Sequence, residues 1–120
     1  MSIKVNDTPV VINYTPYVGD TFGRSFLIKK NGALEDLSLD TFKMRIEDAI
    51  TGTEFLTLET GGGITNTDEG RVTWVITDEQ SSDFTPSRKY KYDIQWTRAD
   101  GMVKTLQRGT MIPEKDVTPA

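Results

Sequence analysis

Apolar and polar residues alternate along several separated runs of this chain, and this alternation limits the fold more than any other feature of the sequence. The runs TFKMRIED (41–48) and KYKYDIQW (89–96) are the clearest cases. In the second run the apolar parity holds Tyr90, Tyr92, Ile94 and Trp96, and the polar parity holds Lys89, Lys91, Asp93 and Gln95. A strand has a side-chain period of two, whereas a helix has a period near 3.6. Since no long window shows the helical period, the sequence predicts an all-β domain.

Turn signals divide the chain into short strands. Asn31-Gly32, Thr51-Gly52-Thr53 and Ala99-Asp100-Gly101 are residue types that favour tight turns. Thr77 and Gln80 fit a capping box, so we expect one short helical turn near residues 78–83, with Phe84 closing one end of the sheets. About seven to nine strands separated by such turns are typical of a single antiparallel β-sandwich of immunoglobulin-like size.

The chain of 120 residues fits one domain over residues 1–120. Residues 1–17 contain an apolar run bounded by Pro9 and Pro16, and we expect them to form an N-terminal arm or an edge strand outside the folded core. Residues 113–120 are expected to form a polar C-terminal tail. The glycine run 61–63 lacks the Lys-Ser/Thr pair of a phosphate-binding loop and is predicted to be a flexible hairpin loop.

The register of the hairpin over residues 89–112 stays open. A four-residue loop from Arg98 to Gly101 would pair Trp96 with Val103. A three-residue loop with a bulge would instead pair Ile94 with Leu106. Gly109 is expected to mark a bulge in the second strand of this hairpin.

The composition excludes several classes of chemistry. The chain has no Cys and no His, which removes disulfides, the usual zinc sites, and Ser-His or Cys-His catalysis. Its formal net charge of −4 argues against binding along a nucleic-acid backbone. The acidic residues near 68–69 and 78–83 lack the spacing of a calcium-binding EF-hand. No apolar leader or membrane span is evident, so we expect a protein made in a cytoplasm. A small sandwich leaves little room for a deep cleft, so we expect no enzyme activity. We also expect no cofactor, metal, nucleic-acid partner, membrane partner or small-molecule ligand.

Tyr14, Tyr17 and Trp96 are the candidate contact residues. The two tyrosines flank Pro16 outside the strongest strand patterns, and exposed tyrosine is favoured at protein interfaces. The alternative is that one or both tyrosines close the bottom of the core. Trp96 lies nearest the turn and is the aromatic residue of its strand expected to be partly exposed.

Short motifs follow one another in a fixed order over residues 19–118. They are Gly19-Asp20, Asp36-Leu37-Ser38, Gly70-Arg71-Val72, Thr77 to Ser81, Tyr90 to Asp93, Asp100-Gly101 and Gly109 to Thr118. Their order and spacing resemble the N-terminal β-sandwich of phage baseplate upper proteins and related tail or head accessory proteins. The resemblance implies a non-enzymatic structural protein of the virion, on the tail, the baseplate or the capsid. It also implies assembly with other virion proteins and with copies of itself, in rings or trimers.

Three functional hypotheses follow for the sequence. In the first, exposed sheet edges and the two termini dock onto a repeated virion protein by strand addition or arm exchange. In the second, a carbohydrate-binding module stacks Trp96, Tyr14 or Tyr17 on the sugar rings of a host surface glycan. In the third, a small acidic protein inhibits or redirects a host protein.

Overall fold

The computed structural model describes residues 2–4 and 9–115, and strands make up most of this part of the chain. In chain order the elements are β1 (Ser2–Lys4), β2 (Val10–Val11), β3 (Phe22–Lys30), β4 (Ala33–Leu34), β5 (Thr41–Asp48), β6 (Glu54–Thr60), β7 (Gly63–Asn66), β8 (Arg71–Ile76), α1 (Asp78–Ser81), β9 (Tyr90–Thr97) and β10 (Val103–Met111). The predicted all-β class is confirmed.

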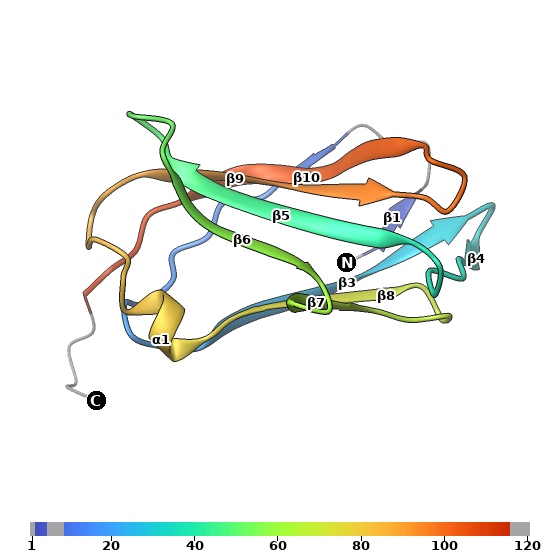
Figure 1. The fold of residues 1–120 in the computed structure, drawn as a ribbon, viewed down its shortest axis with the longest axis horizontal. Helices are drawn as coiled ribbons and strands as arrows, with labels where there is room; N and C mark the ends of the chain where they lie inside the picture. The colour runs from blue at the N-terminus through green and yellow to red at the C-terminus, as the bar shows by residue number, and fades with distance from the viewer. Residues whose placement is uncertain (1, 5–8, 116–120) are drawn as a thin grey trace.

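The strands form one hydrogen-bonded sheet instead of two separate antiparallel sheets. Its order is β1-β3-β8-β7-β6-β5-β9-β10-β2, with β4 paired to β3 beside this path. The pairs β1–β3, β6–β7 and β2–β10 are parallel, so the sheet is mixed. It curls so that β6, β5, β9 and β10 face β8 and β3 across the core (Figure 1). The predicted antiparallel sandwich is therefore corrected to a single curled mixed sheet.

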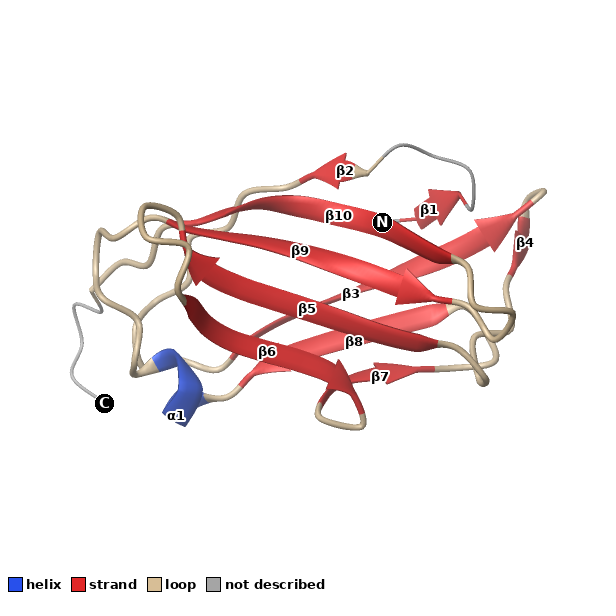
Figure 2. Cartoon of the chain, turned by 45° about the horizontal axis from the view of Figure 1, so that its top comes forward, coloured by secondary structure: helices blue, strands red, loops and turns tan. Residues whose placement is uncertain are grey.

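The glycine run makes the corner between the two facing halves. Gly61 and Gly63 have φ angles of +85° and +101°, which side chains with a Cβ rarely adopt. A Cβ on Gly63 would also lie 2.7 Å from Leu58 Cδ2. β6 and β7 are consecutive strands that meet at this corner (Figure 2). The prediction of a flexible hairpin loop is wrong, because the run is a tight corner whose geometry needs glycine.

The alternation of residues 89–96 predicts the inner face of β9 correctly. Tyr90, Tyr92, Ile94 and Trp96 are all buried, while Lys89, Lys91 and Gln95 are exposed and Asp93 is half-buried. Trp74 and Phe26 from β8 and β3 supply other large side chains of the same core.

The predicted capping box and the plug are confirmed at one end of the sheet. The Gln80 amide N–H donates to Thr77 Oγ1, and the Thr77 amide N–H donates to Gln80 Oε1. Phe84 follows α1, is almost fully buried and stacks on Phe55, with 4.5 Å between the ring centroids. Within the described residues, no helix has the length and apolar character needed to cross a membrane.

The hairpin of β9 and β10 adopts neither of the two registers that the sequence left open. Trp96 pairs with Lys104 and Ile94 pairs with Gln107. The register shifts between Thr105 and Gln107, so the bulge lies at Leu106 and both Leu106 and Gln107 point inward. The predicted bulge at Gly109 is wrong, since Gly109 pairs regularly with Tyr92.

The N-terminal segment supplies the edge strands at both ends of the sheet, β1 at one end and β2 at the other. β1 pairs with β3 at one end, and residues 10–18 run parallel to 107–114 at the other. Ile3 is fully buried, and Pro16 is buried as well, so this segment belongs to the core instead of standing outside it. In the predicted tail, Pro113 is buried and the Glu114 amide donates to the Pro16 carbonyl. Residues 116–120 of that tail lie outside the described residues.

Candidate functional site

Trp96 lies in the core, and the expectation that it is partly exposed is wrong. Its side chain is 1% exposed. The indole N–H donates to Asp40 Oδ2 at 2.8 Å, and Asp40 Oδ1 accepts the Ala99 amide at 3.0 Å. The Arg98 guanidinium lies 4.8 Å from the ring centroid. Trp96 is buried because its side chain lies on the inward face of β9 and because the segment that holds Asp40 covers it.

Tyr14 and Tyr17 have different environments. The Tyr14 ring is half-buried, with its centroid 5.4 Å from that of Phe22 and 5.5 Å from that of Trp74. Tyr14 therefore closes the core, as the alternative interpretation proposed. Tyr17 is 46% exposed. Of the three predicted contact residues, Tyr17 alone presents its side chain to solvent, and the three do not form one surface patch.

A buried polar cluster fixes the N-terminal segment against the sheet. The Gln107 Nε2 atom donates to the hydroxyls of Tyr14 at 2.9 Å and Tyr92 at 2.8 Å. The Tyr92 hydroxyl in turn donates to the Ile12 carbonyl at 2.7 Å. Burial raises the pKa of Tyr92, so this phenol stays protonated and keeps its role as a donor. The cluster holds the segment by buried hydrogen bonds whose loss leaves unpaired polar groups.

A groove of about 680 Å³ lies on the solvent-facing side of β5, β9, β10 and β2. We call this side the outer face. The groove is lined by Pro9, Val11, Asn13, Arg45, Glu47, Lys91, Tyr92, Asp93, Thr105, Arg108, Gly109 and Thr110. The side chains come from four neighbouring strands because β5, β9, β10 and β2 are adjacent in the sheet.

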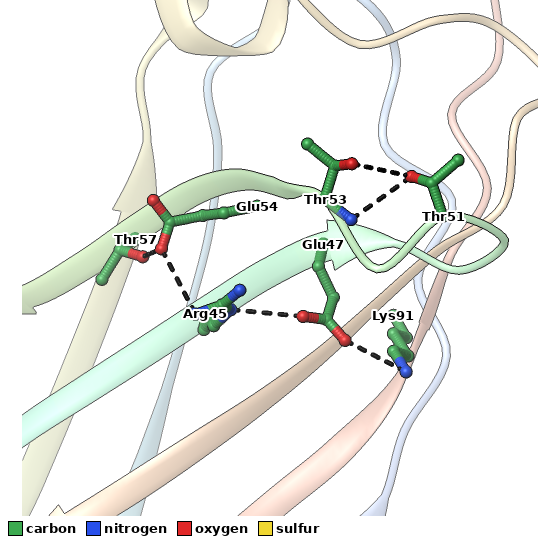
Figure 3. A network of polar contacts seen from close by, with 7 residues as sticks. All are labelled: Arg45, Glu47, Thr51, Thr53, Glu54, Thr57 and Lys91. Atoms are coloured by element: carbon green, nitrogen blue, oxygen red, sulfur yellow. Dashed lines mark hydrogen bonds and ion pairs between the residues drawn. The ribbon is translucent and has the colours of Figure 1, made fainter.

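One wall of the groove carries a network of exposed ion pairs (Figure 3). Glu47 accepts from Arg45 Nε at 3.2 Å and from Lys91 Nζ at 3.0 Å. Arg45 also reaches Glu54, which accepts a hydrogen bond from Thr57 at 2.8 Å. Lys91, more than Arg45, lowers the pKa of Glu47. Exposed pairs of this kind contribute little to stability, so the network mainly orders these side chains.

Asp93 and Arg108 are the unpaired charges of the groove. In the sheet register Asp93 lies between Arg45 on β5 and Arg108 on β10. Even so, neither Asp93 nor Arg108 makes an ion pair or a side-chain hydrogen bond with a described residue. Burial raises the pKa of Asp93, and the negative charge of Glu47 raises it further. A half-buried carboxylate without a partner weakens the fold and is a candidate for contact with another molecule.

We expect Asp93→Asn to stabilise the isolated protein slightly at neutral pH, by less than about 1 kcal/mol. The raised pKa means that the folded state holds the proton more tightly than the unfolded state does. The carboxylate therefore lowers stability at pH 7, and this loss disappears as the pH falls below about 4, the unfolded value. Urea unfolding of both proteins between pH 3 and pH 7 measures the difference. A variant less stable than the wild type at pH 7 would contradict the assignment.

The groove offers contacts for a polar surface and no evident place for a metal ion. Within the described part of the chain, no group of three or more carboxylate, His or Cys side chains is placed to hold a cation. The sequence assigned Lys91 and Asp93 to the outer face of their strand but did not find the groove. Its other residues join them through the pairing of β5, β9, β10 and β2, which no local pattern encodes.

Solved structures with a similar fold include a domain of a phage protein. The N-terminal domain of phage TP901-1 ORF48 aligns with a TM-score of 0.53 at 10% identity, over 95% of each chain. CopC from Methylosinus trichosporium OB3b aligns with a TM-score of 0.44 at 13% identity, over 93% of this chain and 91% of that one. Murine CRIg aligns with a TM-score of 0.40 at 10% identity, over 92% and 95%. No family model and no curated protein matches the sequence. The first alignment shows a shared fold, and the other two carry no argument.

Proposed function

We propose that this protein is a non-enzymatic structural or accessory component of a phage virion and acts by assembling with other virion proteins. The observation that carries the proposal is the fold shared along 95% of the chain with a domain of a phage protein. The ordered motifs over residues 19–118 support the same class, because they resemble phage baseplate upper proteins and related accessory proteins. We also propose that the protein lies on the tail, the baseplate or the capsid of the particle.

The outer face supplies the contact surface in this proposal. Its groove combines exposed ordered charges, such as Arg45 and Lys91, with the unpaired Asp93. Patterned charge of this kind gives specificity and register to a protein interface more than it gives affinity. The carbohydrate hypothesis has less support, because Trp96 is buried and Tyr14 is half-buried and packed against the core, which leaves Tyr17 as the one exposed aromatic side chain among its three candidates.

Mass spectrometry of purified virions tests the proposal. We expect the protein in the particles at a fixed copy number per virion. Particles assembled with the double variant Arg45→Glu and Lys91→Glu, which reverses charge in the groove, should contain much less of it. Lys43→Glu is the matched control for Lys91→Glu alone, because each reverses one charge and Lys43 lies on the same face but does not line the groove. Absence of the wild-type protein from purified particles would contradict the proposed function.

A further inference from the structure

Three connecting segments at the end of the sheet opposite α1 are bonded into one surface (Figure 2). The segments are residues 31–40, 67–70 and 98–102. The Leu37 amide donates to the Thr67 carbonyl at 3.1 Å, and the Ala99 amide donates to Asp40 Oδ1 at 3.0 Å. The segment over 31–40 therefore bridges the other two, and the arrangement is fixed by hydrogen bonds within the chain.

Three large apolar side chains are exposed close together at this end. Leu39, Met102 and Val103 are 81%, 50% and 58% exposed. They lie on neighbouring stretches of the sheet, because Thr97 pairs with Thr41 on β5 and with Val103 on β10. Leu39 comes two residues before Thr41, and Met102 precedes Val103 directly. Single exposed apolar residues are normal on a protein surface, whereas a group of neighbouring ones marks a contact surface.

A hollow of about 340 Å³ borders these side chains on the outer face. Thr41 and Thr97, which join the apolar group to the sheet, belong to its lining. The hollow shares no residue with the larger groove. It offers room for a side chain of a partner beside the exposed apolar group.

The same three segments are acidic. They contain six acidic residues and one basic residue, Arg98. Arg98 is already engaged, since its Nη2 atom lies 2.9 Å from Glu35 Oε2 and its guanidinium lies over the Trp96 ring. The exposed acidic side chains that form no ion pair with a described residue are Asp36, Asp68, Glu69 and Asp100. The basic residues that border the segments on the strands are Lys30, Arg71 and Lys104. With six acidic against four basic residues, this end keeps a negative charge.

We propose that this end of the sheet docks onto another protein, at a surface where apolar side chains are bordered by lysine and arginine. Burial of Leu39, Met102 and Val103 supplies affinity, and the exposed carboxylates select a basic partner. A second copy of this chain fits poorly, because two such ends would place carboxylates against carboxylates. The end shares no residue with the groove of the outer face, so this inference goes beyond the proposed function.

A labelled synthetic peptide in which leucine and lysine alternate is the probe, and fluorescence anisotropy measures its binding to the full chain. We expect binding that weakens as the salt concentration rises. A peptide with glutamate in place of lysine should bind at least about tenfold more weakly. The double variant Leu39→Ser and Met102→Ser should raise the Kd for the lysine peptide about tenfold. Its matched control is Ile50→Ser and Ile112→Ser, which removes two apolar side chains that are 82% and 42% exposed near the other end.

A charge reversal tests the acidic border separately. Asp68→Lys should raise the Kd for the lysine peptide about threefold at low salt. Asp83→Lys is the matched control, because Asp83 is also an exposed aspartate without an ion pair to a described residue and lies beside α1. Both variants change the net charge of the chain equally, so a difference between them reports the position of the charge.

Several results would overturn the proposal. They are no binding of the lysine peptide, equal binding of the two peptides, and equal losses from substitutions at the two ends. Light scattering of the chain alone covers a further occupant: self-association that the Leu39→Ser and Met102→Ser variant abolishes would assign this end to a second copy. Circular dichroism should show the wild-type fold in every variant, since all the substituted residues are exposed. None of these results would remove the protein from purified virions, so the proposed function is tested separately.

Discussion

Replacing Gly109 with alanine is expected to lower the free energy of unfolding by about 3 kcal/mol and to loosen the N-terminal segment. A Cβ at this position would lie 1.8 Å from the Ile12 carbonyl oxygen and 2.7 Å from the carbonyl carbon. These are backbone atoms, which cannot move aside as a flexible side chain does. The segment would have to shift, and the shift would break the bond from the Tyr92 hydroxyl to Ile12.

Urea unfolding measures the loss, and amide hydrogen exchange at residues 12, 14 and 18 locates it. Gly62→Ala is the matched control, because Gly62 has no positive φ and its nearest non-neighbouring atom is 3.6 Å from the added Cβ. We expect the control to unfold close to the wild type. Equal stability of the two alanine variants would show that the segment does not pack on Gly109 as described.

Replacing Trp96 with alanine is expected to cost about 4 kcal/mol, the range for a fully buried aromatic side chain. The substitution opens a cavity beside Phe42, whose ring lies parallel to the indole with 6.2 Å between centroids. It also removes the donor that Asp40 accepts inside the protein. A residue at a surface contact would have little effect on the isolated chain, so stability separates the two roles.

Trp96→Phe is the companion variant. It keeps most of the ring volume and removes the indole N–H. Its free energy of unfolding should therefore lie between the values for the wild type and for Trp96→Ala. Fluorescence adds a second measurement, because Trp74 and Trp96 are both buried and wild-type emission should be that of tryptophan shielded from water. A Trp96→Ala protein within 1 kcal/mol of the wild type would mean that the segment holding Asp40 does not cover this site.

The ordered motifs mark positions that the fold requires. Thr77 and Gln80 cap α1, and Asp36 accepts bonds from the Ser38 amide and hydroxyl in a tight turn. Gly70 has a φ of +75° and sits against the Ile28 carbonyl. Gly109 lets the N-terminal segment approach β10. These motifs therefore bear on the fold that the resemblance implies. The motifs over 90–93 and 109–118 also contribute Lys91, Asp93 and Thr110 to the groove.

The candidate site was less predictable than the core. The alternation in 89–96 identified Asp93 as an outward residue, but its neighbours Arg45 and Arg108 are 48 and 15 positions away in the chain. Tyr17 is exposed, in agreement with its place outside the strongest strand patterns of the sequence. Trp96 does not, since its cover comes from a segment that strand patterns do not describe.

Local patterns were enough to predict the all-β class, the inward face of β9, the capped turn at α1 and the plug at Phe84, because each depends on residues a few positions apart. The strand order, the corner at the glycine run, the bulge at Leu106 and the docking of residues 10–18 on β10 became visible only in the folded chain. These features depend on contacts between distant segments, and several pairings satisfy the same local alternation. The burial of Trp96 and the place of β2 at the end of the sheet follow from that choice of pairing.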